Sequence, residues 1–346
     1  MSTEFLWYIP NQVQSGHRGD DMGVGHNSLD TLTAQALALE RHGWAGALLG
    51  TGWGRPDCFT VGTALAARTT RFNPLIAIRP GYWAPAHFAS AAATLDNLSG
   101  GRLRINIVSG KDDFEAYGDS EGDQVQRYAR TGEFMHLVRR LWSEEQVDFH
   151  GEFYRVAGST AQPRLPKGRR PTLYFGGASE AAERTAAAHA DVQLFWGEPR
   201  TALAERIARL KALPRGLAPL RFGLRITTLV RKTRAEAWAD AEAKVAAMAQ
   251  ASWHDHRRVV AEGQRRLYDL QAQGEVLDEI LYTTPGKFGG GGAGTTWLVG
   301  SPEDVADSLL RYRALGIDTF ILSDTPYLNE IRTQGELLLP LLRQGE

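Results

Sequence analysis

The feature that most restricts the fold of this sequence is a steady alternation of short apolar runs with longer helix-like segments. Each apolar run has the length of a buried strand, and the segment after it can return the chain to a parallel neighbour. Eight such steps favour a (β/α)8 barrel over an open doubly wound sheet. No linker interrupts the alternation, so we expect residues 1–346 to form one domain. The predicted strands lie at 5–9, 45–49, 72–78, 104–108, 173–176, 192–196, 222–230 and 317–322, with a further strand-like stretch at 296–299.

Two stretches interrupt this rhythm. Residues 147–156 alternate with period two around a His-Gly pair, which predicts a surface hairpin. Residues 251–294 are irregular, charged and rich in glycine, and five of the six residues at 289–294 are glycine. A slack linker would share this composition, but so long an irregular segment within a compact barrel is typical of an active-site lid. We therefore predict a mobile lid at 251–294.

The composition limits the kinds of partner. Among the 346 residues, 39 are Lys or Arg and 40 are Asp or Glu, and the net charge of −1 favours neither nucleic acid nor an anionic membrane. A single cysteine, Cys58, excludes an intrachain disulfide and a metal site built from several cysteines. No run approaches 18 apolar residues, and the first ten residues lack the pattern of a signal peptide. We expect a soluble cytoplasmic protein without a metal site.

Ligands of such barrels bind at the C-terminal ends of the strands, and the informative stretches fall there. One is Tyr-Phe-Gly-Gly-Ala-Ser at 174–179. Gly176 and Gly177 would let a ligand approach the backbone, and Ser179 could cap the next helix while the free amides meet a phosphate. An ordinary turn with a serine cap has the same sequence pattern. The stretch at 106–110 also ends a strand in a small polar turn.

Three larger side chains are candidates at the same end of the predicted barrel. Trp196 ends a buried strand, where it could form the wall of a pocket or belong to the core. Arg225 lies within an apolar strand and therefore needs a partner, which could be a bound anion or a structural salt bridge. Arg55 follows the second strand, where surface solvation is the default.

Six stretches taken in order resemble the bacterial-luciferase superfamily: LDNLSGGRLRINIVSG, LYFGGASE, FWGEP, FGLRI, GGGGAGTTWLVGSPEDVA and YRALGIDTFILS. Within it they resemble most the two-component flavin-dependent alkanesulfonate monooxygenases, over essentially the whole chain. The resemblance implies reduced FMN supplied by a separate NAD(P)H-dependent flavin reductase, O2 as co-substrate, and a homodimer or homotetramer. It also implies oxygenative desulfonation of a small organosulfonate to an aldehyde and sulfite.

The resemblance assigns a set of residues to the cofactor. Asn106 and Ser109 would lie along the flavin ring and its ribityl chain, and Tyr128 would hold the phosphate together with the turn at 176–179. Ala77 would precede a non-prolyl cis peptide bond behind the flavin, at Ala77–Ile78. The cofactor-side candidates are therefore Ala77, Asn106, Ser109, Tyr128, Gly176, Gly177 and Ser179.

The substrate side departs from the alkanesulfonate pattern. Thr227 stands where the family has a histidine, and Gly290 stands where it has an arginine. Gln12 occupies the place of an N-terminal histidine, Arg55 that of a cysteine, and Tyr327 ends a Thr-Pro-Tyr in place of Tyr-Pro-His. The substrate-side candidates are Arg225, Trp196, Arg55, Gln12 and Tyr327.

Several functions remain open at this point. A sulfonate is possible if Arg55 replaces the lost arginine, because two cations could clamp an oxyanion. Loss of the histidines equally suits a neutral or larger substrate. A hydride-transferring enzyme of the same superfamily that uses the deazaflavin F420 is a second reading. A non-catalytic flavin-binding barrel is a third, which the lid and Arg225 disfavour.

Overall fold

The computed structural model describes residues 3–11, 25, 27–110, 113–119, 122–250, 262–288 and 295–344. Eight parallel strands form a closed barrel, in which β9 pairs with both β8 and β13 and so completes the ring. The predicted (β/α)8 barrel is confirmed. The barrel strands are β1 (Glu4–Ile9), β2 (Gly46–Leu49), β3 (Asn73–Ile78), β4 (Arg104–Val108), β7 (Thr172–Gly176), β8 (Val192–Trp196), β9 (Arg221–Val230) and β13 (Ile317–Ser323).

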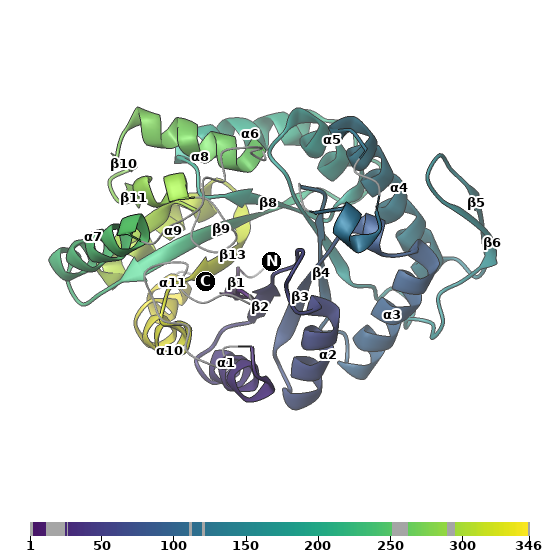
Figure 1. Cartoon of the computed structure of the whole chain (residues 1–346), viewed down its shortest axis with the longest axis horizontal. Coiled ribbons are helices and arrows are strands. Elements are labelled where there is room, and N and C mark those ends of the chain that lie inside the picture. The colour runs from purple at the N-terminus through teal and green to yellow at the C-terminus, as the bar shows by residue number, and fades with distance from the viewer. Residues whose placement is uncertain are drawn as a thin grey trace.

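Helices surround the barrel as an outer ring (Figure 1). Polar caps fix several of their starts, as when Asp57 and Ser301 accept hydrogen bonds from the first-turn amides of the helices they precede. No helix in the described part of the chain is long and apolar enough to cross a membrane. The helices are α1 (Leu29–Arg41), α2 (Cys58–Arg68), α3 (Pro85–Leu98), α4 (Gln124–Ser143), α5 (Glu180–His189), α6 (Arg200–Ala212), α7 (Arg234–Gln250), α8 (Glu262–Gln273), α9 (Pro302–Ala314), α10 (Tyr327–Leu337) and α11 (Leu339–Arg343), with short 3-10 turns η1 (Pro80–Tyr82), η2 (Glu115–Tyr117) and η4 (Thr284–Phe288).

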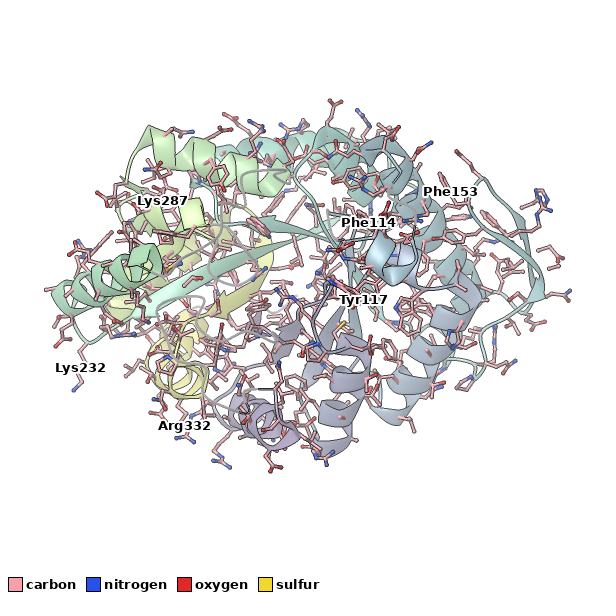
Figure 2. All side chains as sticks on the ribbon, viewed as in Figure 1. Phe114, Tyr117, Phe153, Lys232, Lys287 and Arg332 are labelled. Carbon is pink, nitrogen blue, oxygen red and sulfur yellow. The ribbon has the colours of Figure 1, made fainter. Side chains whose placement is uncertain are left out.

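The predicted surface hairpin is confirmed as a separate antiparallel pair, β5 (Val147–His150) and β6 (Arg155–Ser159). It lies outside the ring of helices, and Figure 2 shows Phe153 in the turn between its strands, at the edge of the molecule. Its turn reaches back to the loop after β3, where the Tyr154 hydroxyl donates to the Pro80 carbonyl at 3.4 Å.

The expectation that 251–294 is irregular is wrong for residues 262–288. These residues form α8, the short strands β10 (Val276–Leu277) and β11 (Leu281–Tyr282), and η4. Leu267 and Leu270 bury one face of α8, and Arg265 pairs with Glu262 at 2.6 Å on its exposed side. β11 pairs with β12 (Trp297–Gly300), which extends the sheet along the second half of β9. The predicted stretch at 296–299 is therefore a strand outside the barrel ring.

The interior of the barrel has an apolar middle and a charged lower end, where the lower end is formed by the N-terminal ends of the strands and the upper end by their C-terminal ends. Its apolar residues come from the barrel strands alone, and Tyr8, Ala77 and Leu194 are among them. At the N-terminal ends of the strands, Glu4 accepts hydrogen bonds from Arg104 at 3.4 Å and from the Tyr174 hydroxyl at 3.1 Å. The opposite end of the interior carries the candidate site.

Candidate functional site

A cavity of about 200 Å³ opens at the C-terminal ends of β4, β7, β8 and β9. Side chains from the strands form its floor, and four residues of α8 form its cover, namely Glu262, Gly263, Arg266 and Leu267. The structure brings six of the predicted site residues into this one cavity: Asn106, Tyr128, Gly176, Gly177, Trp196 and Arg225.

Asn106 carries the clearest mark of a ligand site. It lies on β4 beside Ala77 of β3 and Tyr174 of β7, and only 7% of it is exposed. Its Oδ1 atom accepts no hydrogen bond from the part of the chain that the structure describes. A buried polar atom without a partner costs about 1–3 kcal/mol, so a polar ligand in the cavity would recover this cost.

The glycine turn after β7 is built to expose backbone. A methyl group at Gly176 would meet no atom within 4 Å, whereas one at Gly177 would lie 2.4 Å from the Cβ atom of Ala182. Gly177 is therefore needed where the turn presses against the first turn of α5, and Gly176 faces open space. The Gly177 carbonyl accepts hydrogen bonds from Gln193 at 2.9 Å and Arg206 at 3.3 Å, which fixes the orientation of the turn.

Ser179 is the N-cap of α5, as predicted, and its hydroxyl accepts a hydrogen bond from the Ala182 amide at 3.2 Å. Its neighbour Ala178 lines the cavity. The first amides of a helix have no partner within the helix and carry a positive partial charge, so this end of α5 can accept an anion. The role of Ser179 towards a phosphate stays a prediction.

Ser109 and Ala77 lie away from the cavity. The Ser109 hydroxyl is 2.5 Å from that of Thr131, and it faces a separate space of only about 10 Å³. Phe114, from the loop after β4 that also carries Tyr117 (Figure 2), lines this space. Ala77 is buried within the barrel, and its carbonyl oxygen is 2.7 Å from the Cys58 sulfur.

The predicted cis peptide bond at Ala77–Ile78 is wrong. In the described residues the cis bonds are Gln162–Pro163 and Thr325–Pro326. Both precede proline, where the cis peptide bond is nearly as stable as the trans form. Before other residues the cis form is about 3 kcal/mol less stable than the trans form. Ala77 and Ile78 instead continue the regular parallel pairing of β3 with β4.

Trp196 and Arg225 are neighbours across β8 and β9 and face the cavity together. The guanidinium of Arg225 lies 4.1 Å from the centre of the Tyr8 ring, within range of a cation–π interaction. Tyr8 was missed by the sequence reasoning. The available signal was its place in the first strand, where residues alternate between the barrel interior and the helices.

Two other substrate-side candidates, Arg55 and Tyr327, do not line this cavity. Arg55 donates to the Pro10 carbonyl at 2.6 Å. Tyr327 is buried at the start of α10 and does not line the cavity. Gln12 lies outside the described residues.

A second group that the sequence reasoning missed consists of buried charges beside the cavity. Arg206 and Glu198 are each 3% exposed, line the cavity and form an ion pair. Arg206 lies on the buried face of α6 with Leu203 and Ile207, and an arginine within an apolar helical stripe could have indicated it. Its partner Glu198 has no such signal, because it follows β8 in a loop.

The described part of the predicted lid covers the cavity. The Cβ position of Gly263 is 3.4 Å from ring carbons of Trp196, so the α8 backbone rests directly on the indole. Mobility of the predicted lid stays a prediction, and residues 251–261 and 289–294 lie outside the described residues.

Other kinds of chemistry find less support. The described residues contain no group of three or more histidine, cysteine or acidic side chains that could hold a metal ion. Cys58 is 3% exposed, and burial raises the pKa of its thiol to about 12, so it remains a protonated core residue at neutral pH.

Solved structures share this fold over nearly the whole chain. EDTA monooxygenase from Chelativorans sp. BNC1 superposes with a TM-score of 0.79 at 17% identity, covering 100% of this chain and 94% of the other. A long-chain alkane monooxygenase superposes with a TM-score of 0.77 at 17% identity, covering 100% and 92%. An F420-dependent secondary alcohol dehydrogenase follows with a TM-score of 0.68 at 16% identity, covering 99% and 100%. At these identities the likeness shows the fold.

The family itself is shown by the sequence. The family model of the luciferase-like monooxygenases matches residues 3–319. This range includes all eight strands of the barrel except the end of β13. The predicted resemblance to the bacterial-luciferase superfamily is confirmed, and the chain belongs to the luciferase-like monooxygenases.

Proposed function

We propose that the chain is a monooxygenase that uses reduced FMN, supplied by a separate NAD(P)H-dependent flavin reductase, and O2 to oxidise a small organic anion, with an organosulfonate as the first candidate. The observation that carries this proposal is the set of residues that line a single cavity. It joins the buried Asn106, whose Oδ1 atom has no hydrogen-bond partner among the described residues, and an exposed glycine turn to Arg225 and Trp196.

The residues present fit a flavin mononucleotide. Asn106 offers an amide to the polar edge of the ring, and Gly176 leaves room for close approach to the backbone. The N-terminus of α5, with Ser179 as its cap, suits a phosphate. Tyr128, 8% exposed on α4, lines the same cavity. When bound, FMN would supply the activation of O2.

The cover of the cavity bears on access and on water. The volume of about 200 Å³ is below the roughly 300–1,000 Å³ of ordinary small-molecule sites, so the proposed binding of FMN requires the cover to move outward when the cofactor enters. With α8 back in place, Gly263 and Leu267 would exclude water from the reacting groups.

On the substrate side, Arg225 would hold an anionic group and Trp196 would form the apolar wall. A guanidinium can bind a sulfonate or carboxylate through two parallel hydrogen bonds, which fixes orientation as well as position. The stacking on Tyr8 limits the motion of Arg225 and so helps to orient the bound anion. Arg55 does not line the cavity and donates to the Pro10 carbonyl, so we propose no direct contact between Arg55 and the anion.

A second candidate is hydride transfer with F420. It is supported by the shared fold of the F420-dependent secondary alcohol dehydrogenase. The two functions differ in a direct assay, because only the first consumes O2 in step with the substrate.

The test supplies the purified protein with reduced FMN and O2 and screens alkanesulfonates, matched alkanecarboxylates and neutral alkanes. We expect product formation coupled to O2 uptake for anions, and sulfite release for sulfonates. Turnover of carboxylates alone would replace the sulfonate with another anion. Hydride transfer from reduced F420, with no O2-dependent product from any class, would establish the second candidate.

The phosphate assignment has its own test. Ser179→Asp should weaken binding of FMN by about 1–3 kcal/mol, because it places a negative charge beside the phosphate. Aspartate is also a good helix cap, so α5 should keep its stability. Riboflavin, which lacks the phosphate, should bind the variant and the parent alike. Equal FMN affinity of parent and variant, measured anaerobically by fluorescence quenching, would refute the assignment.

A further inference from the structure

Five charged side chains alternate in sign from the scaffold of the barrel to its cover, and we call them the charge ladder: Arg209, Glu183, Arg206, Glu198 and Arg266. Glu183 accepts hydrogen bonds from Arg209 at 2.9 Å and from Arg206 at 2.8 Å. Glu198 pairs with Arg206 and, through both carboxylate oxygens, with Arg266 of α8, where the Nε–Oε1 distance is 3.1 Å. The ladder therefore joins α5 and α6 to α8.

The charge of the ladder depends on α8. Its scaffold members, Arg206 and Arg209 with Glu183 and Glu198, sum to zero. Arg266 adds one positive charge when α8 rests on the barrel. Of the other charges on α8, Glu262 and Asp269 both contact Arg265, each at 2.6 Å, and Arg265 and Asp269 are more than half exposed, so water screens them. Arg266 is less exposed, and the cover therefore brings its positive charge into the ladder.

The ladder reaches the side of the cavity where the glycine turn begins α5. Arg206, Glu198 and Arg266 line the same cavity as Gly177, and Arg206 donates to the Gly177 carbonyl at 3.3 Å. The middle of the ladder (Glu183, Arg206 and Glu198) is 2–3% exposed, so little water screens it, whereas Arg209 is half exposed and Arg266 partly exposed. A phosphate at the N-terminus of α5 would therefore be attracted more strongly when Arg266 is in place.

We infer that Arg266 determines the preference of this site for a phosphate-bearing cofactor, by making the docking of α8 on Glu198 and the binding of the phosphate favour each other. The inference rests on the proposed function, which places the phosphate at the start of α5. Reciprocity is a thermodynamic requirement: if docked α8 tightens phosphate binding, phosphate holds α8 down by the same factor. Arg266 is then a positioning and specificity residue.

The first experiment compares affinities for FMN and for riboflavin, which differ by the phosphate. Arg266→Gln should weaken FMN binding by about 5- to 50-fold and change riboflavin binding less than about 2-fold. Arg266→Lys keeps the charge but loses the two-point contact with Glu198, so it should recover part of the loss. Arg265→Gln is the matched control, because Arg265 is exposed and pairs within α8. Equal losses for both ligands, or the same loss in Arg265→Gln, would overturn the inference.

The second experiment measures the rate of hydrogen exchange of the α8 amides. If Arg266 only contacted the phosphate and did not hold α8 in place, replacing it would not change this rate. In the parent, FMN should slow this exchange and riboflavin should not. In Arg266→Gln, FMN should have little effect. Slowing by riboflavin as large as that by FMN would contradict a role of the phosphate.

Inorganic phosphate alone separates this inference from the proposed function. If the parent binds neither FMN nor riboflavin, the proposed cofactor is wrong, and the exchange of α8 with and without millimolar phosphate still decides the role of the ladder. Slower exchange in the parent but not in Arg266→Gln would support it. No phosphate effect on the parent would overturn it.

Discussion

The two ends of the barrel interior both contain buried polar groups, but they differ in how those groups are satisfied. At the lower end, Glu4 is bonded to Arg104 and Tyr174, and Arg221 is bonded to Asp318 at 2.7 Å. At the upper end, the Oδ1 atom of Asn106 has no partner in the described residues. Both ends have the polar composition that would suggest a site, but among these described groups the unused bonding capacity lies at the upper end, on Asn106.

Burial and charge therefore do not by themselves mark a functional site. Burial raises the pKa of Tyr174, and the nearby charge of Glu4 raises it further, so the phenol stays protonated and donates its hydrogen bond. This perturbation follows from a closed structural network. Unused hydrogen-bonding capacity beside open space is the more specific sign, and it is found at Asn106.

The largest effect should come from Arg225→Met, which removes the cation of the upper end. We expect kcat/KM for the anionic substrate to fall about 100-fold, because a charge-assisted contact is lost, while the free energy of unfolding changes by less than about 1 kcal/mol. A neutral substrate analogue should be turned over as before, and Arg55→Met should have a smaller effect. A loss of stability larger than the loss of activity would place Arg225 with the structural charges of the lower end.

The second largest effect should be a pH-dependent change in the free energy of unfolding at Glu330, a carboxyl group that is ion-paired and lies outside the cavity. Arg231 is 3.3 Å from Glu330 and also pairs with Asp324, which Lys244 contacts at 2.9 Å. Burial raises the pKa of Glu330 to about 7, the charge of Asp324 contributes, and Arg231 and Lys244 oppose the rise. The folded protein therefore retains a proton that the unfolded chain, with an ordinary pKa of 4.5, releases.

It follows that Glu330 lowers stability progressively as the pH rises from about 4.5 to about 7, and that the full cost remains above this range. Glu330→Gln should be more stable than the parent by about 1–3 kcal/mol at pH 8, with the difference vanishing near pH 4.5. Urea unfolding at several pH values measures this, and FMN affinity should not change. A difference that is the same at pH 5 and pH 8 would contradict the raised pKa.

The smallest effect is expected at the lower end itself. Glu4→Gln should reduce the free energy of unfolding by about 0.5–1 kcal/mol, since the pair with Arg104 is partly exposed and glutamine can still accept from Tyr174. Flavin affinity and turnover should stay at the level of the parent. If Glu4→Gln weakened flavin binding as well, the two ends would be coupled and the distinction between them would fail.

Much of the architecture could be predicted because it depends on residues that are close together in the sequence. The strands at 104–108 and 192–196 have the bounds expected from their apolar patterns, and Ser179 caps α5 as its position before a helix-like run indicated. Failures arose where local composition was a poor guide. The polar segment at 262–273 was expected to be irregular, but it is α8, which two leucines and several internal ion pairs hold in place.

The sequence by itself determined the barrel, the glycine turn before α5, and the presence of Asn106, Trp196 and Arg225 on barrel strands, because periodicity, turn chemistry and capping act between near neighbours. Only the tertiary structure decided which of these side chains share a cavity, that Arg55 stays outside it, and that the Oδ1 atom of Asn106 accepts no hydrogen bond within the described part of the chain. It alone joined Arg206, Glu198 and Arg266 into one ladder. The physical reason is that hydrogen-bond satisfaction and charge balance are set by whatever packs around a group, and most of those neighbours are distant in the chain.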